Sequence, residues 1–307
     1  MKKIVFALLS VVVMICSSTK VEAQEKKKEM FREESMRTYE VGNTTVQLKK
    51  GTVWVYNFGD VKLHAYETKD FFDSYVYLLE KNGKAVLLEC PPIKDNYKEL
   101  VDYIAGLEHK NVDLIVSYHP IGAQFINTDK IKFNVFSMKH AVDHYTTGLG
   151  APSLIGLKDR FGEVFDETIF TEYTNLKEGE NEVGGFKFEM SNVDFAFDVA
   201  IPELNSVHPH MLAHNRHALI FSYEFLDAYI AQLKRYQKVN YEMYLTSHGG
   251  FETRGDVTIK IHYLNDLKEI AKASSTKKEF IDKMNEAYPN FGWSFYLQGT
   301  SSFLFKN

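Results

Sequence analysis

Cysteine is nearly absent from this chain of 307 residues, which contains only Cys16 and Cys90. Cys16 belongs to an N-terminal apolar segment that we expect to be removed from the mature protein. Cys90 would then stand alone, so an internal disulfide is excluded even in a compartment that permits one. The fold must therefore be stabilised by its core or by a metal. A chain that is 45% hydrophobic and 14% aromatic can bury a large core.

Long hydrophobic runs are also lacking. The most apolar segment, Ile4–Cys16, is shorter than the about 20 residues that span a bilayer, and no later stretch is long enough. It follows two lysines and precedes the small-residue pattern Val21-Glu22-Ala23, an order typical of a secretory signal peptide. We therefore expect residues 1–23 to be cleaved and the protein to be periplasmic or secreted, with no stable membrane span. A lipid anchor at Cys16 is the less favoured alternative, because Ile15 replaces the small residue that normally precedes such a cysteine.

A surplus of positive charge is lacking as well. The chain carries 36 Lys and Arg against 41 Asp and Glu. Removal of residues 1–23 takes away three lysines and one glutamate, which leaves 33 basic and 40 acidic residues and a net charge of −7. Phosphate-rich partners need a basic face, so nucleic acid is excluded and a small-molecule substrate is favoured. Composition leaves the oligomeric state open.

Composition also divides the chain. Residues 24–43 begin with a run rich in Lys and Glu and are predicted to be a polar leader. Residues 44–307 carry the strand and helix patterns of a single domain. Each half of this domain begins with short strands and continues with a helix and a further strand. That order predicts two β-sheets packed together with helices outside.

Local signals place individual elements in this domain. Asn82-Gly83 predicts a tight hairpin. Val112–Val116 is an almost continuous apolar run, typical of a buried strand. Between them, a helix is predicted with Asn96 as its N-cap and Glu99 as the reciprocal partner.

Two further segments are assigned from composition. Tyr145–Asp159 contains three glycines and a proline, which predicts a surface loop. Ala218–Phe221 is short and apolar, which predicts a strand.

The order of hairpin, helix and strands carries a resemblance. Its pieces are the hairpin Ser74–Leu78 with Gly83–Glu89, the strand Val112–Ser117 and the late strand end Ser247-His248-Gly249. In order and spacing, roughly residues 46–270 resemble the metallo-β-lactamase superfamily. The resemblance implies an α+β fold, a four-layer αββα sandwich, with a one- or two-zinc site between the sheets. It also implies hydrolysis of esters, amides, thioesters or phosphoesters.

The central motif of that superfamily, His-x-His-x-Asp-His, is largely rewritten in this chain. Only His119 offers a ligand there, and it is out of register. A zinc site needs three or four converging ligands, so a lone histidine is equally well explained as part of a strand-end turn. The four motif positions are occupied by Tyr118, Pro120, Gly122 and Ala123.

A dense group of histidines could complete a metal site. Within ten residues the chain has His208, His210, His214 and His217. In an extended segment His208 and His210 would point the same way, whereas in a helix His210, His214 and His217 would share a face. A surface loop with local hydrogen bonds is the alternative. His248 ends a predicted buried strand beside two glycines and is the strongest single candidate.

These patterns predict one metal ion, taken to be zinc, held by His210 and His248 together with His119 or His214. The bound metal would activate water for attack on an ester, lactone or amide bond.

The remaining roles are assigned around this site. Asp198 is the predicted catalytic base, and Tyr118 and His217 are predicted to contact the substrate. Cys90 could act as a nucleophile if a neighbouring base lowered the pKa of its thiol, although a buried cysteine usually packs as a small hydrophobe. The competing hypothesis is a metal-free, non-catalytic relative in which the pocket binds a ligand.

Overall fold

The computed structural model describes residues 44–124, 126, 128–148 and 150–305. All of the described residues belong to one compact unit, which the chain divides off at residue 40. The predicted signal peptide, the polar leader and the alternative anchor at Cys16 lie outside the described residues. These assignments and the domain boundaries therefore stay predictions.

Two β-sheets form the centre of the fold. The first is antiparallel from β1 to β5 and parallel from β5 to β8. Within the described residues its strands lie in sequence order: β1 (Thr44–Gln47), β2 (Thr52–Phe58), β3 (Val61–Glu67), β4 (Tyr75–Lys81), β5 (Lys84–Leu88), β6 (Asn111–Ile115), β7 (Lys132–Ser137) and β8 (Thr174–Asn175).

The second sheet is antiparallel except where β12 runs parallel to β13. From one edge to the other, the described strands are β14 (Phe251–Thr253), β13 (Met243–Leu245), β12 (Ser206–His208), β11 (Ala196–Ile201), β10 (Phe186–Val193) and β9 (Gly179–Val183).

The main core lies between these two sheets. Buried side chains of the first sheet, such as Leu63 and Tyr77, join one apolar cluster with side chains of the second, such as Phe186, Phe188 and Phe197. β10 shows why these residues form a strand, because its buried and exposed positions alternate at its start and only one face of the strand meets the core.

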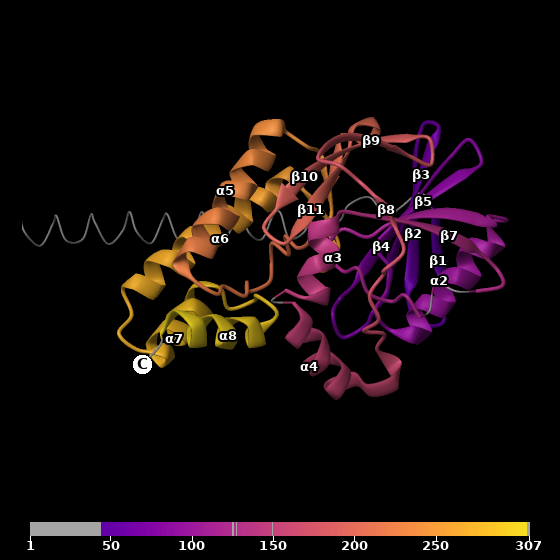
Figure 1. Ribbon diagram of the computed structural model, residues 1–307. Coiled ribbons are helices and arrows are strands. Elements are labelled where there is room, and N and C mark those ends of the chain that lie inside the picture. The colour runs from indigo at the N-terminus through magenta and orange to yellow at the C-terminus, as the bar shows by residue number, and fades with distance from the viewer. Residues whose placement is uncertain (1–43, 125, 127, 149, 306–307) are drawn as a thin grey trace, which may run out of the picture. The chain divides into compact units, whose positions relative to one another are not determined.

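Helices cover the outer faces (Figure 1). An apolar stripe of α2 packs on the first sheet, while α5 and α6 lie beside β10 and β11 on the far side of the second. The predicted four-layer αββα sandwich is therefore confirmed. The described helices are α2 (Lys94–Gly106), α3 (Lys139–Thr146), α4 (Ala151–Phe161), α5 (Tyr223–Val239), α6 (Arg254–Lys272), α7 (Lys277–Ala287) and α8 (Ser294–Leu304). Of these described helices, none is both long enough and apolar enough to traverse a bilayer.

Three local predictions can be compared with the strands and helices directly. The hairpin is confirmed, since Asn82 (φ 51°) and Gly83 (φ 73°) turn the chain between β4 and β5. The buried strand is confirmed as β6. The prediction of Asn96 as a helix N-cap is wrong, because α2 begins after Ile93 without a side-chain cap. The amide of Asn96 instead donates to the Tyr66 hydroxyl at 3.1 Å.

Two segments were assigned wrongly from composition. Tyr145–Asp159 contains the end of α3 and most of α4 rather than a continuous loop. Ala218–Phe221 pairs with no described strand. Its backbone groups are bound by side chains instead: the N–H of Ile220 donates to the Thr300 hydroxyl at 2.8 Å, and that hydroxyl donates to the Ala218 carbonyl at 2.8 Å. A polar residue of α8 thus replaces the sheet partner.

Candidate metal centre

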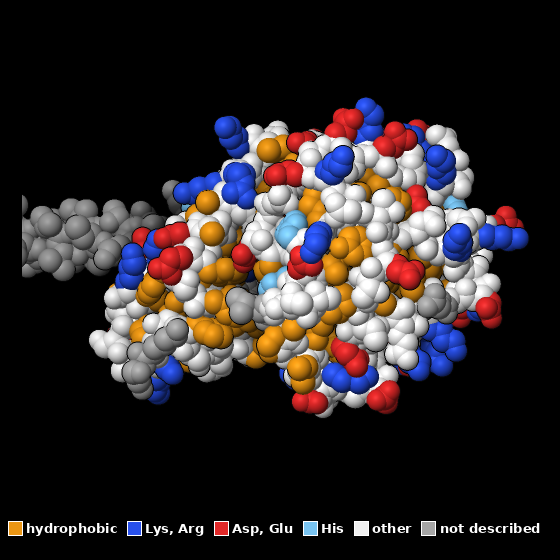
Figure 2. Space-filling model, viewed as in Figure 1, with side chains coloured by type: hydrophobic (Ala, Val, Ile, Leu, Met, Phe, Trp, Pro, Cys, Tyr) orange, Lys and Arg blue, Asp and Glu red, His pale blue; other side chains and the backbone are white. Residues whose placement is uncertain are grey.

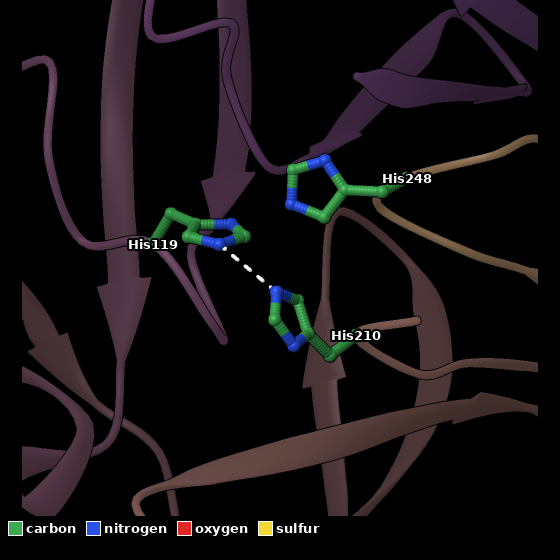
Figure 3. Close-up of side chains that lie close together, drawn as sticks. All are labelled: His119, His210 and His248. Atoms are coloured by element: carbon green, nitrogen blue, oxygen red, sulfur yellow. Dashed lines mark hydrogen bonds between the residues drawn. The ribbon is translucent and has the colours of Figure 1, made fainter. Parts of the chain in front are cut away.

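Three histidines from separate loops meet at one end of the sandwich (Figure 3). His119 follows β6 of the first sheet, while His210 and His248 follow β12 and β13 of the second. One ligand atom from each residue lies within 4.8 Å of the others, and the Nε2 atoms of His119 and His210 are 3.2 Å apart. Nitrogens about 2.0–2.1 Å from one tetrahedral ion would be separated by roughly 3.3 Å, so the arrangement fits a shared metal.

The sheet topology explains why these loops meet. β12 and β13 are parallel neighbours, so the loops that follow them leave the same edge of the second sheet. A bridge between Met211 and His248 ties the two loops together. The turn after His248 needs glycine, because Gly249 has φ 84° and an added Cβ would lie 3.2 Å from the Ala213 Cβ.

The ring orientations also suit ligation. His248 donates from Nδ1 to the Phe72 carbonyl at 2.9 Å, which leaves its Nε2 without a proton. His119 directs Nδ1 towards the Glu89 carboxylate at 3.7 Å. Burial and the neighbouring imidazoles lower the pKa of His248 to about 3 and hold that of His210 well below its usual value. Both rings are therefore neutral near pH 7, which is the form that binds a metal.

Glu89 anchors the loop that carries His119. Its buried carboxylate accepts hydrogen bonds from the backbone N–H groups of Ser117 and Tyr118, both at 2.8 Å, and from that of His119 at 3.2 Å. Burial opposes the charge, yet the imidazoles of His119 and His208 hold the pKa of Glu89 well below its usual range. Glu89 had no predicted role, although its position directly after β5 was a signal.

Tyr118 and Asp198 lie behind His210, inside the fold. The Tyr118 ring stacks on the His210 ring with 4.9 Å between centroids and 16° between planes. Its hydroxyl donates to Asp198, whose other oxygen accepts a 2.6 Å hydrogen bond from the Tyr236 hydroxyl. Burial raises the pKa of Asp198 above its usual value. The structure thus places Asp198, the predicted base, and Tyr118, the predicted substrate contact, in a buried network that touches the three-histidine cluster through the Tyr118 ring.

The structure does not bring His214 and His217 into the cluster. The segment that contains them is not a helix, so the spacing that would align them with His210 does not apply. The Nδ1 atom of His214 lies 3.1 Å from the Glu252 carboxylate, and that interaction raises the pKa of His214 although burial alone would lower it. His217 lies 3.1 Å from the Tyr263 hydroxyl, and burial lowers its pKa to about 4.

A cavity of about 500 Å³ opens beside the three histidines. Cys90 is part of its wall, but the thiol donates to the Ile121 carbonyl at 3.2 Å and burial raises its pKa well above the usual value. Such a thiol is a poor nucleophile. The rest of the wall is mostly apolar, with Phe72, Leu154, Leu157, Phe165 and Tyr296 among its residues.

Comparisons with known proteins identify the fold. No protein-family model and no curated protein match the chain. A stereoselective inverting sec-alkylsulfatase from Pseudomonas is 12% identical with a TM-score of 0.54, and the match covers 91% of this chain and 61% of that one. A β-lactamase domain protein from Burkholderia ambifaria is 15% identical with a TM-score of 0.54, over 82% of this chain and 87% of that one.

A metallo-β-lactamase family protein from Thermus thermophilus is also similar in structure, at 13% identity and a TM-score of 0.52. That match covers 78% of this chain and 90% of the other. The chain spans about 61% of the length of the alkylsulfatase. The protein therefore has the metallo-β-lactamase fold, as the sequence resemblance implied. At these identities the likeness establishes the fold alone.

Proposed function

We propose that the protein is an exported, metal-dependent hydrolase that cleaves an ester, lactone or amide bond in a small molecule. The observation that carries this proposal is the convergence of three histidines from three loops on one point beside a cavity. Three imidazoles that converge in this way could supply the ligands of one shared cation. Export is supported by the predicted signal peptide.

His119, His210 and His248 would hold the ion, and zinc is the ion we propose. When bound, such an ion supplies Lewis-acid polarisation of the scissile bond and of water. Glu89 holds the backbone of the His119 loop, and the Phe72 carbonyl holds the His248 ring in the tautomer that ligates. Each of these contacts preorganises a ligand before the substrate arrives.

The cavity wall offers no free carboxylate to act as a general base, as far as the described residues show. Along the described part of the chain, Glu89 is the one carboxylate in the cavity wall, and both of its oxygens accept hydrogen bonds from the backbone. A carboxylate so engaged is poorly placed to take a proton from water. We therefore expect esters and lactones with good leaving groups to be cleaved faster than amides.

The direct test is metal analysis of tag-free protein after zinc loading and dialysis. About one equivalent of zinc is expected for the natural sequence, because three preorganised imidazoles bind zinc tightly at neutral pH. His248→Ala should lose the metal and hydrolysis of an activated ester while remaining folded. His262→Ala is the matched control, since His262 is exposed on α6. Less than about 0.2 equivalents of zinc in the unaltered protein would exclude the metallohydrolase.

A second candidate function is metal-free ligand binding. It is favoured by the substitution of Tyr118, Pro120, Gly122 and Ala123 at the central motif, together with the largely apolar cavity. Retention of three converging histidines argues against it. Protein that binds no zinc and hydrolyses no ester, but takes up an apolar ligand, would support this alternative.

A further inference from the structure

Among the described residues, the cavity beside the histidines has one exposed, unpaired charge in its wall, the cation Arg160. Apart from those histidines, the charged residues in its wall are Glu89 and Arg160. Glu89 is buried and its charge is balanced by the N–H groups and imidazoles described above. Arg160 is exposed on α4, and within the described residues no carboxylate lies within ion-pair distance of it. Its neighbour Lys158, by contrast, pairs with Glu167 at 3.0 Å.

The guanidinium of Arg160 is held by aromatic rings rather than by an acid. It lies 4.2 Å from the ring centroid of Phe71 and 5.3 Å from that of Phe161. Stacking on a ring face orients a guanidinium while its N–H groups stay free to bind an anion. Arg160 is therefore a preoriented cation that no acid of the described residues neutralises.

An aromatic cluster adjoins this cation. Phe71 and Phe295 are 51% and 50% exposed, and their rings stack at 6.3 Å. With Phe161 they form what we call the aromatic rim. Figure 2 shows hydrophobic side chains gathered on the face that carries α4 and α8. Exposed apolar surface next to a binding cavity is typical of a site for an apolar ligand.

We propose that the substrate is an amphiphilic anion, whose apolar body lies against the cavity wall and whose anionic end binds Arg160. This proposal rests on the proposed function and deepens it, since it names the substrate class for the same cavity. Phe72, Leu154 and Leu157 supply the apolar wall. Each methylene group buried there strengthens binding by about fourfold, and the guanidinium fork adds charge-assisted hydrogen bonds to a carboxylate or sulfate. The hydrolysed bond is then separate from the anionic group.

The test measures binding rather than turnover, so that it does not depend on catalysis. Isothermal titration of zinc-free protein compares decanoate, decan-1-ol and decylammonium, which share one alkyl chain and differ in head-group charge. Decanoate is expected to bind about tenfold more tightly than decan-1-ol, with decylammonium weakest, as one charge-assisted contact predicts. Arg160→Gln should bring decanoate to the affinity of decan-1-ol, and Arg160→Lys should keep part of the difference.

Arg235→Gln is the matched control, because Arg235 is exposed on α5, outside the cavity wall, and loses the same charge. Its decanoate affinity should equal that of the unaltered protein. Equal affinities for the three probes, or no binding of any of them, would overturn the proposal. So would a decanoate preference that needs zinc and survives Arg160→Gln, since the anion would then sit on the metal. Failure to bind zinc contradicts only the proposed hydrolase and leaves this titration interpretable.

Discussion

Two histidine clusters in this molecule have opposite chemistry. On the outer face of the first sheet, the Glu80 carboxylate lies between two rings: one oxygen bonds the Nε2 of His64, and the other bonds that of His109 at 2.6 Å. In the candidate metal centre, the ring nitrogens of His119 and His210 face each other. An imidazole nitrogen that donates to a carboxylate is unavailable to a metal, whereas one that faces another imidazole is available. The number of histidines in a cluster therefore does not decide whether it can bind a metal. The group that each imidazole nitrogen faces does.

The largest effect should come from removing the charge that supports the metal centre. Glu89→Gln puts an amide where backbone N–H groups donate, so we expect stability to fall by about 2–4 kcal/mol and zinc affinity to fall roughly 10–100-fold. Urea unfolding and competition with a zinc-binding dye measure the two effects. Glu80→Gln is the matched change in the other cluster and should leave zinc affinity unchanged. Equal zinc losses in both variants would erase the distinction between the clusters.

A smaller effect is expected from the ring that joins the metal centre to the buried network. Tyr118→Phe keeps the ring on His210 but removes the hydroxyl that donates to Asp198, so stability should fall by about 1–3 kcal/mol. The absorption spectrum of the cobalt-substituted protein should change little, because the ring contact persists. Tyr118→Ala, which removes the ring, should change that spectrum. An unaltered spectrum in the alanine variant would show that the ring does not position His210.

The other cluster predicts a pH dependence of stability. Hydrogen bonding from His64 is the main cause, against partial desolvation, and lowers the pKa of Glu80 from 4.5 to about 2. A carboxyl group with a depressed folded-state pKa stabilises the protein above its unfolded pKa and loses that contribution as the pH falls. The advantage of the natural protein over Glu80→Gln, about 1 kcal/mol after solvent screening, should therefore shrink between pH 4.5 and about 2. Thermal unfolding across this range measures it, and a pH-independent difference would contradict the assignment.

The smallest effect concerns the lone thiol of the cavity wall. Cys90→Ala should cost about 1 kcal/mol of stability through lost packing and leave ester hydrolysis and zinc content unchanged. The reason is that the thiol is buried, protonated and bonded to a carbonyl. Loss of hydrolysis with zinc retained would instead indicate that the Cys90 thiol, and not metal-activated water, is the nucleophile.

The elements that obey local rules could be predicted from the sequence. Asn82-Gly83 turns the chain because both positions need left-handed backbone, and β6 follows from its apolar run. Asn96 could not be predicted, because its amide binds Tyr66 and the Thr68 carbonyl, which are distant in the chain. A short side chain that can cap a helix can equally bind a neighbouring strand, and only packing decides between the two.

The candidate site shows the same limit. Each of His119, His210 and His248 could be recognised as a histidine close after a strand, but their convergence depends on how two sheets pack. His214 and His217 would share a face with His210 only if the segment were helical. The chain there turns instead, with Ala213 at φ 46°, and sends both rings towards acidic or phenolic partners. Of the four histidines in this dense segment, the structure places His210 beside His119 and His248.

Phe72 contacts both the cavity and His248, so it could couple ligand binding to metal binding. Its carbonyl holds the ring of His248, while its side chain lines the cavity and packs on Phe161 at 5.2 Å. A ligand that presses on this side chain must act on the backbone that orients the metal ligand. By thermodynamic linkage, whatever factor the ligand applies to zinc affinity, zinc must apply to ligand affinity. The short loop between β3 and β4 therefore lies where binding of a ligand in the cavity and binding of an ion by His248 would be coupled.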